Sequence, residues 1–203
     1  MLKVCIISGS HRSQSNSAKI AKFIEKRFYA LSGEVETDVV DLHAEKIPMW
    51  DEGIFQKDSP FNQIWQPISA RLKKADAFVI LSPEWGGMVT PGLKSFLLCC
   101  NDSELSHKPA MIGAVSAGQG GAYPISELRS SGYKNNQVVF VPDHLIFRDA
   151  THLFNDEKPA NDFDVYMRTR LDYALNVLIQ YGHALKQVRE SGCVDVKKYP
   201  YGM

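Results

Sequence analysis

The stretch KVCIISGSHRSQSNSAKIAKFIEKRFYAL, residues 3–31, holds the pattern that decides the fold. Residues 3–8 form a short apolar run, which predicts a buried strand. After a polar turn, apolar side chains recur at helical spacing over residues 16–31 and predict an amphipathic helix. A buried strand that turns directly into a helix is the building unit of proteins with a parallel sheet.

The rest of the chain repeats this alternation. It predicts further strands at residues 35–42, 76–83, 109–117 and 136–142, and further helices at residues 62–75, 91–100, 122–133 and 163–190. Several strands are apolar almost throughout, as expected when helices cover both faces of a parallel sheet. The prediction is therefore an α/β fold, with a five-stranded parallel sheet between two layers of helices, in one domain over residues 1–203.

Three details of this outline are less regular. We expect Pro67 in or near the first turns of its helix, and the last helix could break near Gly182. Residues 143–162 show no regular pattern and are longer than an ordinary connection. Loops of that length are typically functional or mobile, so this one could lie over a bound ligand.

The composition excludes several classes of function. Lys and Arg together number 23, as do Asp and Glu, so the zero net charge gives no sign of nucleic acid or a membrane surface as partner. The four cysteines form no C-x-x-C pair, and neither they nor the six histidines have the spacing of metal ligands. No apolar run is long enough to span a bilayer and no signal peptide is evident, so we expect a cytoplasmic protein.

In doubly wound sheets, ligands bind in the loops at the carboxyl ends of the strands. The first such loop, GSHRSQSNS at residues 9–17, offers a glycine, several hydroxyls and Arg12 before a helix N-terminus, a combination that suits a phosphate group. The glycines of a dinucleotide fingerprint and the lysine of a P-loop are absent, which favours a terminal monophosphate. We expect Asn16 or Ser17 to be the N-cap of the following helix. The alternative for the loop as a whole is a serine-rich cap on a solvated turn.

Two later strand-end loops are rich in glycine, so their backbone is not covered by side chains. Gly86 and Gly87 follow Trp85 in the stretch 81–97, and three glycines fall within the stretch 115–129. Each loop alone could be a flexible turn, but together they describe a slot in which a planar ring approaches the backbone. A planar ring with one terminal phosphate fits flavin mononucleotide, FMN.

Three motifs resemble those of the NADPH-dependent FMN reductase family, in the flavodoxin-like superfamily. They are GSHRSQSNS (9–17), PEWGGMVTPGLKS (83–95) and SAGQGGAYPISELR (116–129), and the resemblance spans roughly residues 1–142. It implies a flavodoxin-like three-layer sandwich. It also implies phosphate contacts from Ser10, Arg12 and Ser15, with Asn16 or Ser17 in place of the family's asparagine.

The same resemblance implies where the flavin ring would lie. Ring-side contacts would come from Pro83, Glu84, Trp85, Gly86, Gly87, Ser116, Gly118 and Gly120. Trp85 and Gly86 replace the family's usual tyrosine and asparagine. Glu84 would hold the loop by hydrogen bonds rather than act as a catalytic acid.

The expected function is an FMN-dependent oxidoreductase that takes a hydride from NADPH or NADH. The acceptor would be free flavin, a quinone, an azo or nitro compound, or a metal ion. Since the cofactor performs the chemistry, we expect no catalytic side chain. The family also implies a homodimer or homotetramer. The alternatives are a flavodoxin-type electron carrier, which zero net charge disfavours, and an FMN-binding protein without turnover.

Overall fold

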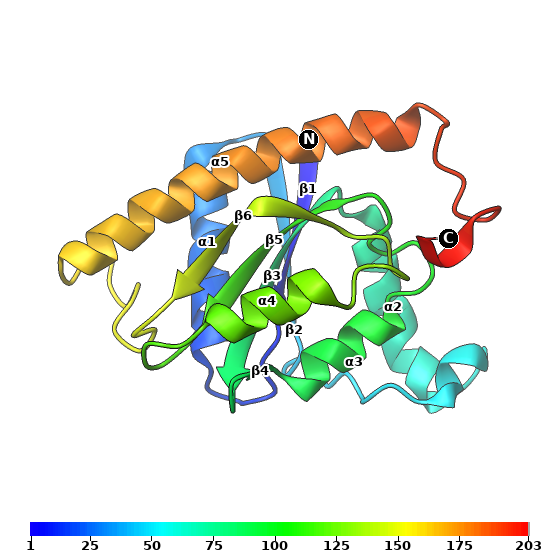
Figure 1. Cartoon of the computed structure of the whole chain (residues 1–203), viewed down its shortest axis with the longest axis horizontal. Helices are drawn as coiled ribbons and strands as arrows, with labels where there is room; N and C mark the ends of the chain where they lie inside the picture. Colours follow the sequence, from blue (N-terminus) through cyan, green and yellow to red (C-terminus); the bar gives the residue numbers. More distant parts are fainter. Residues whose placement is uncertain (203) are drawn as a thin grey trace.

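The computed structural model describes residues 1–202 and contains a central parallel sheet with helices on both faces (Figure 1). Five strands run parallel in the spatial order β2-β1-β3-β5-β6. Their bounds are β1 Leu2–Ser8, β2 Val35–Asp41, β3 Ala77–Trp85, β5 Pro109–Val115 and β6 Val139–Phe147. This confirms the predicted flavodoxin-like α/β fold, with one addition: the short strand β4, Met88–Val89, pairs antiparallel with the end of β3.

The two layers of helices pack against separate hydrophobic clusters. The helices are α1 Asn16–Leu31, α2 Pro60–Lys74, α3 Pro91–Cys99, α4 Ala122–Ser130 and α5 Asp162–Glu190, with short 3₁₀ turns η1 Glu52–Phe55 and η2 Pro200–Gly202. Helices α1 and α5 cover one face of the sheet, and α2, α3 and α4 cover the other. Because side chains alternate along β1, Ile6 joins the first cluster and Ile7 the second.

Two helices differ from the prediction. Helix α2 begins at Pro60 behind the N-cap Ser59, so Pro67 lies inside the helix rather than in its first turns. Pro67 has no N–H to donate to the Gln63 carbonyl. Both residues are exposed, so water can reach that carbonyl. Helix α5 runs unbroken through Gly182, where a Cβ would approach Leu2 at 2.8 Å. This glycine therefore permits close packing of α5 on β1.

The last parallel strand also differs. It begins at Val139 rather than residue 136 and continues to Phe147, into the region that had no regular pattern. Pro142 interrupts the apolar run, but β6 pairs only with β5 and a proline is tolerated on an edge strand. Among residues 1–202, no helix combines the length and the apolar character that crossing a bilayer would require.

Candidate functional site

The loops after β1, β3 and β5 meet at the carboxyl edge of the sheet, as predicted. A cavity of about 120 Å³ lies between them. Its lining consists of Ser10, Arg12, Ser15, Asn16, Ser17, Pro83, Glu84 and Trp85, together with Val115 and Ala117, which the sequence did not single out. The fold thus brings the five predicted phosphate-binding residues of the loop together with Pro83, Glu84 and Trp85 at the end of β3.

A wider groove continues from this cavity along α1. It has a volume of about 740 Å³ and shares Arg12, Ser15, Asn16 and Ala117 with the cavity. Ligand pockets for molecules of cofactor size usually measure several hundred cubic ångströms. The cavity alone is too small for FMN, whereas cavity and groove together offer enough space.

Gly9 fixes the path of the first loop. Its N–H donates to the Leu81 carbonyl at 2.8 Å, and a Cβ at this position would lie 2.6 Å from that same oxygen. Only glycine permits so close an approach between the loop and β3. The loop is therefore held beside the end of β3 before any ligand binds.

The hydroxyls of this loop have different partners. Ser15 Oγ accepts from the Ala18 N–H at 3.0 Å, so Ser15 is the N-cap of α1 and the prediction of Asn16 or Ser17 was wrong. Ser10 Oγ accepts from the Arg12 N–H at 3.3 Å. Both hydroxyls keep their own hydrogen to donate, since each uses only an oxygen lone pair in these contacts.

Two groups of the loop are without partners in the part of the chain that the structure describes. Arg12 is exposed and forms no ion pair there. Ser17 Oγ is buried beside the cavity and makes no hydrogen bond. A buried hydroxyl without a partner is costly, so a site that leaves one here fits a ligand rich in oxygen acceptors. The phosphate of FMN is such a group.

Glu84 connects the second loop, in the stretch 81–97, to the third loop, in the stretch 115–129. Its Oε2 accepts from the Gly121 N–H at 2.6 Å, and its Oε1 occupies the space that a Cβ on Gly120 would need. The carboxylate thus holds the loop by a hydrogen bond, as expected, and it explains why position 120 is glycine.

Gly86 and Gly87 form the turn of the β3–β4 hairpin. Trp85 pairs with Met88 across it, and both glycines have positive φ, 58° and 74°. Positive φ at both positions of a two-residue hairpin loop is the geometry of a type I′ turn, and glycine adopts it without strain. The backbone conformation therefore accounts for this pair of glycines, and neither belongs to the cavity lining.

The third loop faces the groove through Ala117. Ser116 Oγ accepts from the Gly118 N–H at 3.2 Å, which shapes a tight turn. A Cβ on Gly118 would meet nothing within 4 Å, so this position is open. Ser116, Gly118 and Gly120 lie next to the cavity without lining it, whereas Ala117 lines both the cavity and the groove.

Two histidines support the first loop and were not predicted to do so. The His11 ring lies over Gly92 at the start of α3, and its backbone carbonyl contacts His43 Nδ1 at 3.0 Å. Burial lowers the pKa of His11, the neighbouring His43 lowers it further and Asp41 opposes both. His11 is therefore neutral at pH 7 and acts in packing. No spacing signal in the sequence links it to Gly92.

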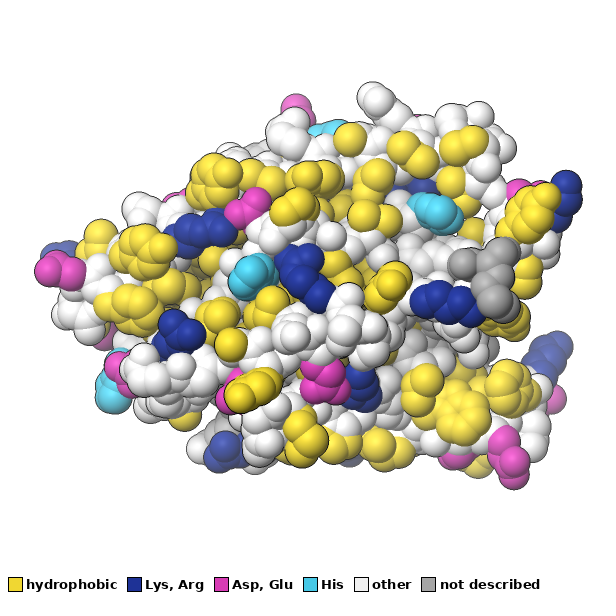
Figure 2. Space-filling model, viewed as in Figure 1, with side chains coloured by type: hydrophobic (Ala, Val, Ile, Leu, Met, Phe, Trp, Pro, Cys, Tyr) yellow, Lys and Arg dark blue, Asp and Glu magenta, His cyan; other side chains and the backbone are white. Residues whose placement is uncertain are grey.

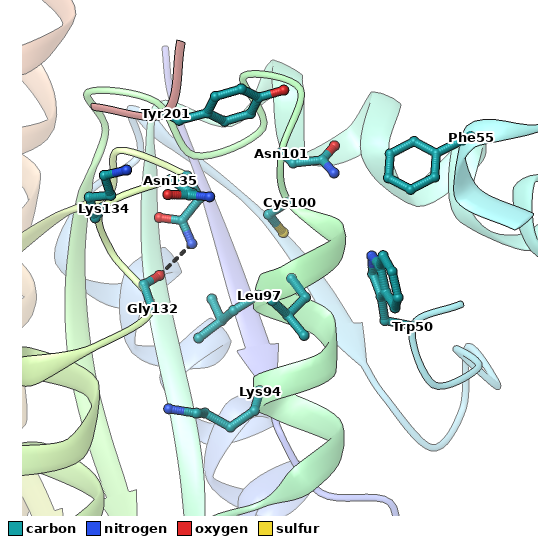
Figure 3. A pocket seen from close by; sticks show the side chains of 12 residues that line it. Trp50, Phe55, Lys94, Leu97, Cys100, Asn101, Gly132, Lys134, Asn135 and Tyr201 are labelled. Atoms are coloured by element: carbon teal, nitrogen blue, oxygen red, sulfur yellow. Dashed lines mark hydrogen bonds between the residues drawn. The ribbon is translucent and has the colours of Figure 1, made fainter. Parts of the chain in front are cut away.

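A separate cavity of about 570 Å³ lies beside α3 and contains none of the predicted site residues. In Figure 3, Trp50 and Phe55 stand on one side of α3, and Lys134, Asn135 and Tyr201 lie toward the other. It is more apolar than the cavity at the carboxyl edge and has no phosphate-binding loop. We therefore place the candidate cofactor site at the carboxyl edge.

The chain is similar to several known proteins. The flavoenzyme FerB from Paracoccus denitrificans, an NAD(P)H:(acceptor) oxidoreductase, superposes with a TM-score of 0.73 at 18% identity, over 91% of this chain and 98% of FerB. An NADPH azoreductase of Bacillus sp. (strain OY1-2) is 27% identical over 76% of this chain and 88% of its own length. A quinone reductase of Escherichia coli (strain K12) is 24% identical over 93% of this chain and 97% of its own length.

The strand order and the two layers of helices define a protein of the flavodoxin-like α/β class. More narrowly, residues 2–152 match the family described as NADPH-dependent FMN reductase, and the chain belongs to that family. It is an NAD(P)H-dependent flavin oxidoreductase, with FMN as cofactor and NAD(P)H as co-substrate.

Proposed function

We propose that this enzyme passes electrons from NAD(P)H to a small organic acceptor. The single observation that supports the site best is the cavity in which the phosphate loop meets the end of β3. Bound FMN supplies the hydride and electron chemistry, while the protein binds and orients it. No side-chain nucleophile or general base is needed for this activity.

The residues have separate roles in this proposal. Ser10, Arg12, Ser15, Asn16 and Ser17 hold the phosphate, supported by their common cavity and by the unpaired Arg12 and Ser17 groups. Pro83, Glu84, Trp85, Gly86 and Gly87 border one side of the ring. Ser116, Gly118 and Gly120 border another, with Ala117 added by the cavity lining.

Among the possible acceptors, we favour quinones and azo compounds over free flavin, nitro compounds and metal ions. The relatives named azoreductase and quinone reductase support this choice. Trp85, Met88 and Tyr123 support it too, because all three are exposed hydrophobic side chains at or beside the hairpin tip. Such side chains suit a flat aromatic acceptor better than a hydrated ion.

We also propose a homo-oligomer that acts in the cytoplasm. Figure 2 shows hydrophobic side chains gathered over η1 and α3, where Trp50, Phe55 and Leu98 are exposed beside the 570 Å³ cavity. Protruding apolar side chains next to a hollow suit a two-fold contact between copies of one chain, since each copy offers both features. The four free thiols are consistent with a reducing compartment.

An anaerobic reduction experiment tests the function. The flavin is first released by heat and identified by chromatography, with FMN expected and FAD as the contradicting result. The holoprotein is then mixed under argon with NADPH or NADH. Rapid loss of flavin absorbance, restored by a quinone or an azo dye, is expected. Slow bleaching with either nucleotide would instead indicate an electron carrier or an FMN-binding protein without turnover.

A further inference from the structure

The segment of residues 147–155, which begins with the last residue of β6, contacts the third loop of the candidate site through its backbone. The Phe147 carbonyl accepts from the Ser116 N–H at 2.9 Å, and the Ala150 N–H donates to the Ser116 carbonyl at 3.0 Å. The Asp149 N–H donates to the Gly118 carbonyl at 2.9 Å. These bonds make the position of the third loop depend on this segment.

The same segment contacts the start of α1, directly after the phosphate loop. Lys19 Nζ donates to the Ala150 carbonyl at 2.8 Å, the Thr151 carbonyl at 3.2 Å and Asn155 Oδ1 at 2.8 Å. Asn16 Nδ2, in the phosphate-loop motif itself, donates to Thr151 Oγ1 at 3.3 Å. The segment therefore bridges two of the three loops from which the site is built, the phosphate loop and the third loop.

The bridge is anchored in the core rather than lying loosely over it. Phe154 is buried, and its ring stacks on Phe23 of α1 with centroids 4.1 Å apart and a 7° angle between planes. The Arg168 guanidinium lies 4.9 Å from the Phe23 centroid and donates to the carbonyls of Asp156 and Glu157. Such anchoring lets the segment transmit a fixed spacing.

We propose that Lys19 is a positioning residue of the cofactor site. Through residues 147–155 it holds the phosphate loop and the third loop at the separation that FMN requires. This inference rests on the proposed FMN site and adds to it a residue that does not touch the cofactor.

The hydrogen bonds of Lys19 separate positioning from direct phosphate binding. A lysine ammonium has three N–H donors, and the three oxygens of residues 150, 151 and 155 use all of them. No donor remains for a phosphate oxygen. Lys19 therefore acts on the ligand through the loops, and its loss should affect the ring side as much as the phosphate side.

Lys19→Met tests this inference, because methionine keeps the length of the side chain and removes the donors. Lys26→Met is the matched control: Lys26 is an exposed lysine two turns further along α1 and lines neither the cavity nor the groove. Each apo-protein is titrated with FMN and with riboflavin, which lacks the phosphate. We expect Lys19→Met to weaken the binding of both ligands by roughly tenfold and Lys26→Met to leave both affinities unchanged.

Two further variants separate positioning from folding. Lys19→Arg should restore most of the affinity, since a guanidinium can donate to the same oxygens. Thr151→Val removes only the contact with Asn16 and should weaken both ligands by a smaller factor. This variant keeps the test informative if Lys19→Met fails to fold.

Each remaining outcome counts against the inference. Loss of FMN affinity with unchanged riboflavin affinity would show that Lys19 binds the phosphate directly. A lower melting temperature with normal affinities would show a purely structural role. A wild-type protein that binds neither ligand would instead refute the proposed FMN site, so the two failures are distinguishable.

Discussion

Arg12 stands at the mouth of the cavity without an ion-pair partner among residues 1–202. Arg12→Ala should therefore cost little in folding and weaken FMN binding by about 2 kcal/mol, roughly thirtyfold in Kd. Riboflavin, which has no phosphate, should bind both proteins equally. Titration of each apo-protein checks this, with Lys26→Ala as the control, because it removes an exposed positive charge that lines neither the cavity nor the groove. Equal FMN affinity of wild type and Arg12→Ala would remove Arg12 from the site.

Lys108 gives a prediction about stability and pH. Its buried ammonium donates to the Leu72 and Lys73 carbonyls at the end of α2, both at 2.9 Å, and to the Glu104 carbonyl at 2.8 Å. Burial, with a further contribution from Arg189, lowers its pKa from 10.5 to about 8. Between these two values the unfolded chain binds more protons than the folded one, so the Lys108 contribution to stability rises with pH.

The measurement is the free energy of unfolding of wild type and Lys108→Met between pH 7.5 and 10.5, chosen to span that interval. The difference between the two should shift in favour of wild type by up to about 3 kcal/mol. The comparison with the variant is needed because burial raises the pKa of the Cys5 and Cys100 thiols, which titrate in the unfolded chain over the same range. Parallel curves for the two proteins would contradict the prediction.

At the scale of the elements, the β3–β4 hairpin depends on positive φ at Gly86. Asparagine tolerates this conformation, whereas a β-branched residue does not. Gly86→Asn should therefore keep apo-protein stability within about 0.5 kcal/mol, and Gly86→Val should lose about 1–2 kcal/mol. Thermal unfolding of the apo-proteins checks the backbone argument. FMN titration of Gly86→Asn then reports whether a side chain at this position obstructs the ring.

Equal stability of the Asn and Val variants would mean that the hairpin does not need this turn. Reduced FMN affinity with normal stability in Gly86→Asn would place the turn against the ring. Unchanged affinity would leave backbone geometry as the sole reason for glycine here, and position 86 would leave the proposed site.

The bounds of the elements show how much of the fold could be predicted from the sequence. Helices α1 and α3 and strands β1 and β5 lie close to their predicted bounds, because each has a clear period or a continuous apolar run. Strand β6 was placed too early because Pro142 and Asp143 interrupt its apolar pattern. Only its position at the edge of the sheet, which the sequence does not reveal, makes that interruption tolerable.

The site was predicted to a similar degree. The phosphate loop and the end of β3 meet in one cavity as expected, since their spacing along the chain places both at strand ends. The contributions of Ala117, His11 and Lys19 were missed. Each depends on a contact between distant segments, such as Lys19 with Ala150, and no local pattern reports such a contact.

At the scale of the whole molecule, the exposed apolar surface over η1 and α3 predicts self-association. Leu98 has 62% of its surface exposed, so Leu98→Lys should disturb the isolated fold little. We expect the wild type to sediment as a dimer or larger oligomer and the variant to shift toward the monomer. Tyr29→Lys is the control, because Tyr29 is 60% exposed on α1, across the sheet from α3. A monomeric wild type would overturn the proposal.

The bridge formed by residues 147–155 has a consequence for how the protein is made. Lys19 reaches its partners in that segment across 131 to 136 positions of the chain. Synthesis from the amino terminus therefore produces the phosphate loop early and the bridge that holds it late. We expect nascent chains to acquire FMN only after the bridge has left the ribosome. Fragments that end before it should remain without cofactor and be open to proteolysis.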